Sequence, residues 1–193
     1  MPRKTPQKSP VSRKRKTGYL PILIGAAVAL IIGLFLISRR GDVIFRTAGR
    51  PAAEEKEIAV YFSSVDGLGL QAEKIRIKKG TVEEELNAAL ALLVKGPNEK
   101  GLGKTLPDET KINGLKIKGH TVIVDFSPEI SANHAGGSSG EIQTVYSIVN
   151  TVALNFPQFK DVQLLVDGKK AETLAGHIDI TRPLSPDVKV IKK

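Results

Sequence analysis

A run of 18 residues without a charged side chain, Leu20–Ile37, constrains this chain more than any other feature. As a helix it would extend about 27 Å, close to the ~30 Å hydrocarbon core of a bilayer. Its Leu, Ile, Val and Phe residues favour insertion by roughly 4–7 kcal/mol in total. The run therefore predicts one membrane-spanning helix, assigned to residues 20–38.

The flanks of this run predict its orientation. Seven Lys or Arg residues lie in residues 1–19, and four lie in residues 39–50 together with Asp42. The more basic flank stays cytoplasmic, so the C-terminal part is expected outside the cytoplasmic membrane. The alternative is a cleaved signal peptide. Those peptides have apolar cores of about 7–15 residues and a small-residue cleavage site, whereas this run continues into Ser38-Arg39-Arg40.

The net charge of +9 belongs to the N-terminal region. Residues 1–50 contain 11 basic residues and one acidic residue, whereas residues 51–193 contain 18 basic and 19 acidic residues. A basic tail beside a membrane span is attracted to anionic lipid and enforces topology. Nucleic acid is therefore not an expected partner. The absence of cysteine excludes disulfides, thiolate metal sites and cysteine nucleophiles.

Small residues recur every fourth position in the run, at Gly25, Ala29 and Gly33. They share one helix face, and such faces let two membrane helices approach closely. Self-association through this face is one interpretation. The other is that Gly and Ala are simply common in membrane spans.

The remainder divides into a linker, one domain and a tail. Residues 39–57 lack apolar periodicity and are rich in Gly, Pro and charge, which predicts a flexible linker. Residues 58–183 are enough for one domain with a core and too few for two. Residues 184–193 are assigned as a C-terminal tail.

The first half of the domain shows two strands and a helix. Apolar residues predict a strand over 58–63, and alternation of Ile with Lys or Arg predicts a second over 72–78. Thr81 and Glu84 then match a capping box, which predicts a helix start. Gly96-Pro97 ends that helix.

The second half repeats the pattern. Residues 115–126 predict a hairpin with its turn at Gly119-His120, residues 141–155 a helix, and residues 162–166 a strand, with a further strand expected near 172–180. Strands with one apolar and one basic face are buried on one side only, so both helices must cover the same side. The fold class is therefore α+β: a two-layer sandwich with a mixed sheet, in the order β-β-α-β-β-α-β.

Eight short segments appear in a fixed order across this domain. They are Val60-Tyr61-Phe62, Leu92-Leu93-Val94-Lys95-Gly96-Pro97, Leu106-Pro107, Val124-Asp125-Phe126-Ser127, Gly136-Gly137-Ser138-Ser139-Gly140-Glu141, Asn150-Thr151-Val152, Val166-Asp167-Gly168 and Leu174-Ala175-Gly176-His177. Together they resemble the GerMN domain of sporulation and spore-germination proteins.

The resemblance implies a membrane-tethered module outside the cytoplasm, related to ring-building domains of secretion-type assemblies. It implies roles in the cell envelope, in peptidoglycan remodelling and, in spore formers, in sporulation and germination. The family has no established catalytic residues or cofactor, so none is carried over. GerM resembles a tandem of two such domains, whereas this chain has one.

The glycine-rich loop is the first candidate site, formed by Gly136, Gly137, Ser138, Ser139 and Gly140. It satisfies G-x-S-x-G, and Asp167 and His177 follow in the order of a hydrolase triad. However, eleven residues separate Ser138 from the preceding strand, whereas a nucleophile elbow follows its strand directly. The other interpretations are a helix cap and a small-anion site at the helix N-terminus, with Glu141 opposing the anion.

The second candidate is a basic sheet face formed by Lys74, Arg76, Lys78, Lys116 and Lys118. If their strands are neighbours, these five charges could bind an anionic wall polymer or lipid headgroups. The alternative is an ordinary solvated face. The three histidines lie in different elements, so no metal site is predicted. The sequence thus favours a binding or scaffolding module of the envelope, with a weak serine hydrolase using Ser138 as the alternative.

Overall fold

The computed structural model describes residues 25, 28–32, 35 and 54–192. The chain divides into two units, residues 1–52 and 53–193. In the first unit, the described residues are helical. Within the described residues, no helix combines the length and apolar character needed to cross a membrane. Most of the run Leu20–Ile37 lies outside them, as do residues 1–19, most of the linker and Lys193.

The second unit begins with an antiparallel pair, β1 (Glu55–Ser63) and β2 (Leu70–Lys78), in which Ile58 lies opposite Ile75. β1 therefore starts three residues before the predicted start of the domain. The hairpin forms because inward Ile58, Val60 and Phe62 are fully or almost fully buried.

Helix α2 (Val82–Lys95) follows, and its predicted capping box is confirmed. The Thr81 hydroxyl accepts from the Glu84 N–H at 3.3 Å, and the Glu84 carboxylate accepts from the Thr81 N–H at 2.8 Å. Gly96 ends the helix with φ of 92°, a conformation that glycine adopts without a Cβ penalty.

A three-stranded mixed sheet comes next, in the order β3-β4-β5. The predicted hairpin is confirmed, with β3 (Ile112–Lys118) antiparallel to β4 (Thr121–Phe126). β5 (Asp161–Val166) runs parallel to β4. Short α3 (Glu129–Ala132) and α4 (Ser138–Ala153) connect them, and a 3-10 turn, η1 (Val188–Val190), lies near the C-terminus.

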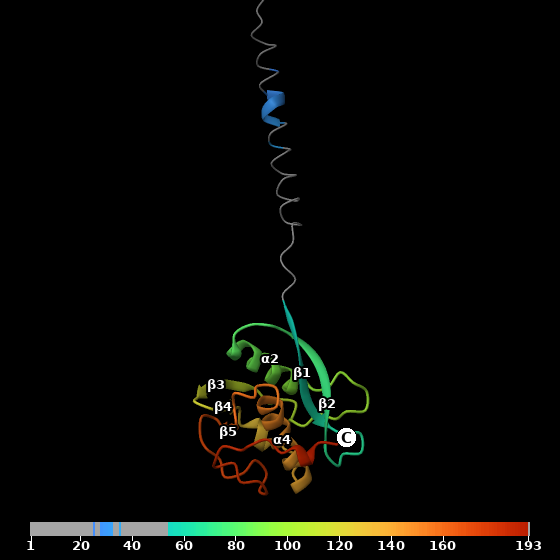
Figure 1. Cartoon of the computed structure of the whole chain (residues 1–193), viewed down its shortest axis with the longest axis vertical. Helices are drawn as coiled ribbons and strands as arrows, with labels where there is room; N and C mark the ends of the chain where they lie inside the picture. Colours follow the sequence, from blue (N-terminus) through green and yellow to red (C-terminus); the bar gives the residue numbers. More distant parts are fainter. Residues whose placement is uncertain (1–24, 26–27, 33–34, 36–53, 193) are drawn as a thin grey trace, which may run out of the picture. The chain divides into compact units, whose positions relative to one another are not determined.

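The α+β class and the order of the main elements are confirmed, but the prediction of one sheet is wrong. The strands form two sheets, and α2 and α4 pack against each other and against both (Figure 1). Their side chains share one continuous core that includes Phe62, Leu90 and Val124. The helices therefore join the two sheets instead of covering one face of a single sheet.

The reason is that polar side chains at the end of α4 and just after it occupy the outer edge of β1. Asn155 Oδ1 accepts from the Ala59 N–H at 2.8 Å, and Asn155 Nδ2 donates to the Ala59 carbonyl at 2.6 Å. The Thr151 hydroxyl accepts from the Tyr61 N–H at 3.1 Å. Because these groups bond to the backbone of β1 at Ala59 and Tyr61, no further strand of the described chain pairs there, and that edge of β1 forms only an isolated bridge between Ser63 and Gly103.

The expected strand near residues 172–180 is also absent from the described chain, where this segment is irregular. One backbone hydrogen bond closes the segment, because the Ile180 N–H donates to the Glu172 carbonyl at 2.9 Å. Its backbone is held by a buried side chain of α4, which is part of the candidate site.

Candidate functional site

The glycine-rich loop leads directly into α4. Gly136 and Gly137 both have φ of 82°, and Gly137 is the N-cap residue with no side-chain cap. α4 therefore begins at Ser138, three residues before the predicted start. Ser138 and Ser139 are exposed in its first turn. The interpretation of the loop as a helix cap holds for Gly137, which supplies the backbone conformation rather than a hydroxyl.

The sequence suggested that Glu141 lies beside the candidate anion site at the N-terminus of α4. The structure places its side chain elsewhere. It is fully buried, and its carboxylate accepts the backbone N–H groups of Leu174, Ala175 and His177 at 2.7–2.8 Å. His177 Nδ1 lies 3.2 Å from the same carboxylate. Burial alone would raise the pKa of Glu141, but the backbone hydrogen bonds outweigh it and lower the pKa below its ordinary value. Glu141 thus holds the segment 174–178 as a structural anion.

Ser138, Asp167 and His177, which follow the chain order of a hydrolase triad, do not form one in the structure. His177 contacts Glu141, and no hydrogen bond joins Ser138 to His177 among the residues that the structure describes. Asp167 lies in the turn after β5, where its N–H donates to the Phe126 carbonyl at 2.9 Å. Helix α3 also separates β4 from Ser138, so the strand does not turn directly into α4.

A cavity of about 270 Å³ lies beside the loop. His134 lines it, with Nδ1 accepting from the Gly136 N–H at 2.9 Å and Nε2 3.0 Å from the Thr144 hydroxyl. Because a backbone N–H donates to Nδ1, this ring carries its proton on Nε2 and donates it to Thr144. His134 therefore has a structural role in fixing the loop.

The other histidines lie apart from His134. His120 Nδ1 is 2.9 Å from the Gln158 carbonyl, in the β3–β4 turn. Across residues 54–192, no three His, Asp or Glu side chains form a group suited to a metal ion.

The predicted basic face is divided between the two sheets. Lys74 and Arg76 lie on β2 and pair with Glu57 at 3.0 Å and Glu55 at 3.9 Å on β1. Lys116 and Lys118 lie on β3, in the other sheet, and pair with no described acidic residue. The condition that the strands be neighbours is not met, so the prediction of one five-charge sheet face is wrong.

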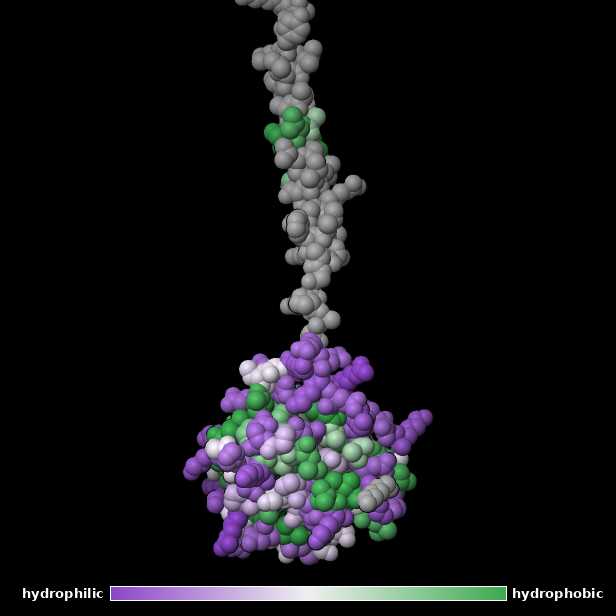
Figure 2. All heavy atoms as spheres, in the orientation of Figure 1, coloured by the Kyte–Doolittle hydropathy of each residue, from purple (hydrophilic) through white to green (hydrophobic). Residues whose placement is uncertain are grey.

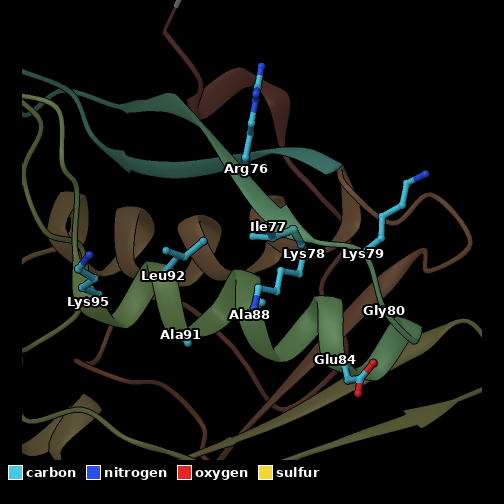
Figure 3. A pocket seen from close by; sticks show the side chains of 10 residues that line it. All are labelled: Arg76, Ile77, Lys78, Lys79, Gly80, Glu84, Ala88, Ala91, Leu92 and Lys95. Carbon is cyan, nitrogen blue, oxygen red and sulfur yellow. The ribbon is translucent and has the colours of Figure 1, made fainter. Parts of the chain in front are cut away.

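Two of those five residues instead contribute to a different surface, the β2–α2 groove, which has a volume of about 600 Å³ (Figure 3). We define its floor as Ile77, Ala88, Ala91 and Leu92, and its rim as Arg76, Lys78, Lys79 and Lys95. In Figure 3, the stem of Lys78 extends from the strand towards Ala88 on the helix. The groove combines an apolar floor with a cationic rim.

The charges of the rim are only partly neutralised. Lys79 Nζ pairs with Glu54 at 2.8 Å, and Arg76 pairs with Glu55. Lys78 and Lys95 form no ion pair within the described chain. Glu84 also lines the groove, but its carboxylate is used in the capping box.

The alternating pattern of β2 indicates Arg76 and Lys78 as candidate site residues, but it does not indicate the groove. The groove requires β2 and α2 to lie side by side, with small Ala88 and Ala91 in its lining. The available signal was the pair of alanines on a helix that follows a basic strand after a tight connection. That signal is weak, because alanine is common in any helix.

Comparison with known proteins decides the family. A family model described as sporulation and spore germination, named Germane, matches residues 59–172, which is more than half of the chain. This chain belongs to the GerMN family. A search of curated protein sequences finds no significant match.

Solved structures agree with this family. The tandem GerMN domains of the sporulation protein GerM from Bacillus subtilis are 25% identical with a TM-score of 0.57, covering 75% of this chain and 50% of that one. The first GerMN domain alone is 23% identical with a TM-score of 0.51, covering 68% and 96%, and shows the same fold. The chain therefore spans half of the tandem protein and corresponds to one domain.

A candidate lipoprotein from Clostridium perfringens is also similar. It is 25% identical with a TM-score of 0.50, and the alignment covers 72% of this chain and 93% of that one.

Proposed function

We propose that this chain is a non-catalytic binding or scaffolding module, tethered to the cytoplasmic membrane by residues 20–38 with its GerMN domain on the outer side. The observation that carries the proposal is the order of the chain: a basic tail, an uncharged apolar run and then, after a short connection, a GerMN domain. The description of one neighbour as a candidate lipoprotein supports an envelope location.

The tether is supported by the sequence, and the described residues 28–32 within the apolar run are helical. The non-catalytic role is supported by the structure of the domain. In the domain, the only G-x-S-x-G serine is not paired with a base among the described residues. In the face shown in Figure 2, the domain is mainly hydrophilic, with hydrophobic residues in small groups.

The module is proposed to act in peptidoglycan remodelling or in sporulation and germination assemblies. Its partners are then envelope proteins or peptidoglycan, together with further copies of the chain through Gly25, Ala29 and Gly33. GerM of Bacillus subtilis is a sporulation protein, which supports this environment.

Topology is tested with single cysteines, because the chain contains none. We expect a membrane-impermeant maleimide to label Asn113→Cys, at an exposed position of β3, in intact cells. The matched variant Ser12→Cys, in the basic tail, should be labelled only after the cells are lysed. Labelling of Ser12→Cys in intact cells, or protection of Asn113→Cys, would contradict the proposed orientation.

The non-catalytic role is tested at Ser138. We expect a fluorophosphonate probe to leave the full chain unlabelled, because no histidine is placed to activate the hydroxyl. Ser138→Ala and the neighbouring Ser139→Ala should behave as the wild type does. Labelling of the wild type and of Ser139→Ala, but not of Ser138→Ala, would support the hydrolase instead.

A further inference from the structure

We propose that the β2–α2 groove binds an anionic phospholipid of the membrane leaflet that faces the domain. This inference deepens the proposed function and rests on the membrane tether. Three observations carry it: the charge of the rim, the apolar floor and the position of the groove in the chain.

The rim matches an anionic headgroup. Four cationic residues line the groove in a domain whose residues 51–193 are slightly acidic overall. In Figure 3, the side chains of Arg76 and Lys79 extend away from α2, whereas that of Lys78 extends towards it. Lys78 and Lys95 have no ionic partner among the described residues. Arg76 and Lys79 pair with acids whose side chains are 56% and 78% exposed. Such exposed pairs are weak, so both cations are able to turn to a phosphate.

The floor matches the part of a lipid next to its headgroup. Ala88 and Ala91 carry only a methyl group, which leaves a hollow between α2 and β2 bordered by Ile77 and Leu92. A volume of about 600 Å³ lies in the range of pockets that bind small molecules. In Figure 3, the side chain of Lys78 extends from the strand to the helix and its ammonium group ends beside Ala88, so its apolar stem covers part of this hollow.

The position of the groove favours a membrane over a distant partner. The Lys79 N–H donates to the Glu54 carbonyl at 2.7 Å, so the rim lies where the chain enters the domain. Only 16 residues separate Ile37 from Glu54. That length allows a separation of at most roughly 60 Å even when fully extended. The proposed tether therefore limits the distance between the rim and the bilayer to that length.

The test places a reporter next to the groove in the full chain. Asn87→Cys, on the exposed side of α2 one turn from Ala91, is labelled with an environment-sensitive fluorophore. The labelled chain is reconstituted in nanodiscs of phosphatidylcholine with increasing phosphatidylglycerol. We expect a blue shift that depends on phosphatidylglycerol, whereas the same label at Asn113→Cys on β3 should not respond.

Charge variants show whether the groove itself is responsible. Lys78→Gln with Lys95→Gln should weaken the apparent affinity for phosphatidylglycerol roughly 30-fold, because each lysine near an anionic surface contributes roughly fivefold. Lys116→Gln with Lys118→Gln removes the same charge outside the groove and should leave the affinity essentially unchanged. If the two double variants lose the same affinity for phosphatidylglycerol, the groove is not the binding site.

The remaining outcomes separate the two proposals. A chain that enters nanodiscs but shows no phosphatidylglycerol-dependent shift overturns the groove inference and leaves the tether intact. A chain that elutes apart from the nanodiscs without detergent overturns both. A shift produced by a soluble acidic amphipathic peptide, and not by phosphatidylglycerol, identifies a protein as the occupant and also overturns the inference.

Discussion

Glu141→Ala is expected to destabilise the domain by about 3–5 kcal/mol, because buried polar groups without partners cost about 1–3 kcal/mol each. The carboxylate accepts three backbone N–H groups from the segment 174–178. Alanine would leave these donors without an acceptor, one of them on buried Leu174. Guanidinium denaturation of the chain at neutral pH, followed by circular dichroism, measures the free energy of unfolding.

The matched control is Glu83→Ala. Glu83 is also an acidic residue in the first turn of a helix, but it is exposed. Its loss should cost no more than the helix-dipole contribution, about 0.3–1 kcal/mol. A cost for Glu141→Ala as small as that of Glu83→Ala would show that water or other groups replace the carboxylate.

The Glu141 contribution should also depend on pH. The pKa of Glu141 is lower in the folded chain than its ordinary value of 4.5, so its contribution is present above that value. It is lost as the pH falls from there through the lower folded pKa. The stability difference between the wild type and Glu141→Gln should therefore shrink below about pH 4.5. A difference that stays constant to lower pH would show that protonation does not weaken these bonds.

Asn155→Ala is expected to destabilise the domain by about 2–3 kcal/mol, because it removes two hydrogen bonds to β1 and leaves both backbone groups of Ala59 unpaired. A third bond, from Asn155 Nδ2 to the Thr151 carbonyl, is lost as well. Guanidinium denaturation measures the change in the free energy of unfolding. Hydrogen exchange shows which part of β1 is affected, because the amide of Ala59 should exchange faster while that of Tyr61 keeps its Thr151 partner.

Asn87→Ala provides the comparison for this variant. Asn87 donates only to the Glu83 carbonyl within its own exposed helix face. Its replacement should change the stability by no more than about 0.5 kcal/mol, the usual range for surface sites. Unchanged exchange at Ala59 in Asn155→Ala would mean that the edge of β1 is protected by something other than this amide.

Local patterns in the sequence predicted the elements well. The capping box at Thr81 and Glu84, the stop at Gly96 and the turn at Gly119 each depend on residues within a few positions of one another. Such interactions are decided by backbone chemistry that the sequence displays directly. The same holds for the resemblance to GerMN domains, which rested on short segments in order and is confirmed.

Long-range placements could not be predicted in this way. Glu141 was placed at the mouth of the loop because it follows the loop in sequence, yet it turns inwards to residues 174–178. Lys116 and Lys118 were placed beside Lys74 because all five cations alternate with apolar residues. Periodicity gives the face of a strand on which a residue lies, but not the strand beside it.

The sequence by itself determined the type and order of the main strands and helices, the concentration of positive charge before residue 51 and the family. The tertiary structure alone decided that the strands divide into two sheets, that Glu141 is buried, and that Lys78 and Lys95 share one groove. The physical reason is that these outcomes depend on which backbone groups find partners. Asn155 meets Ala59 only after residues 96 positions apart in the chain have packed together.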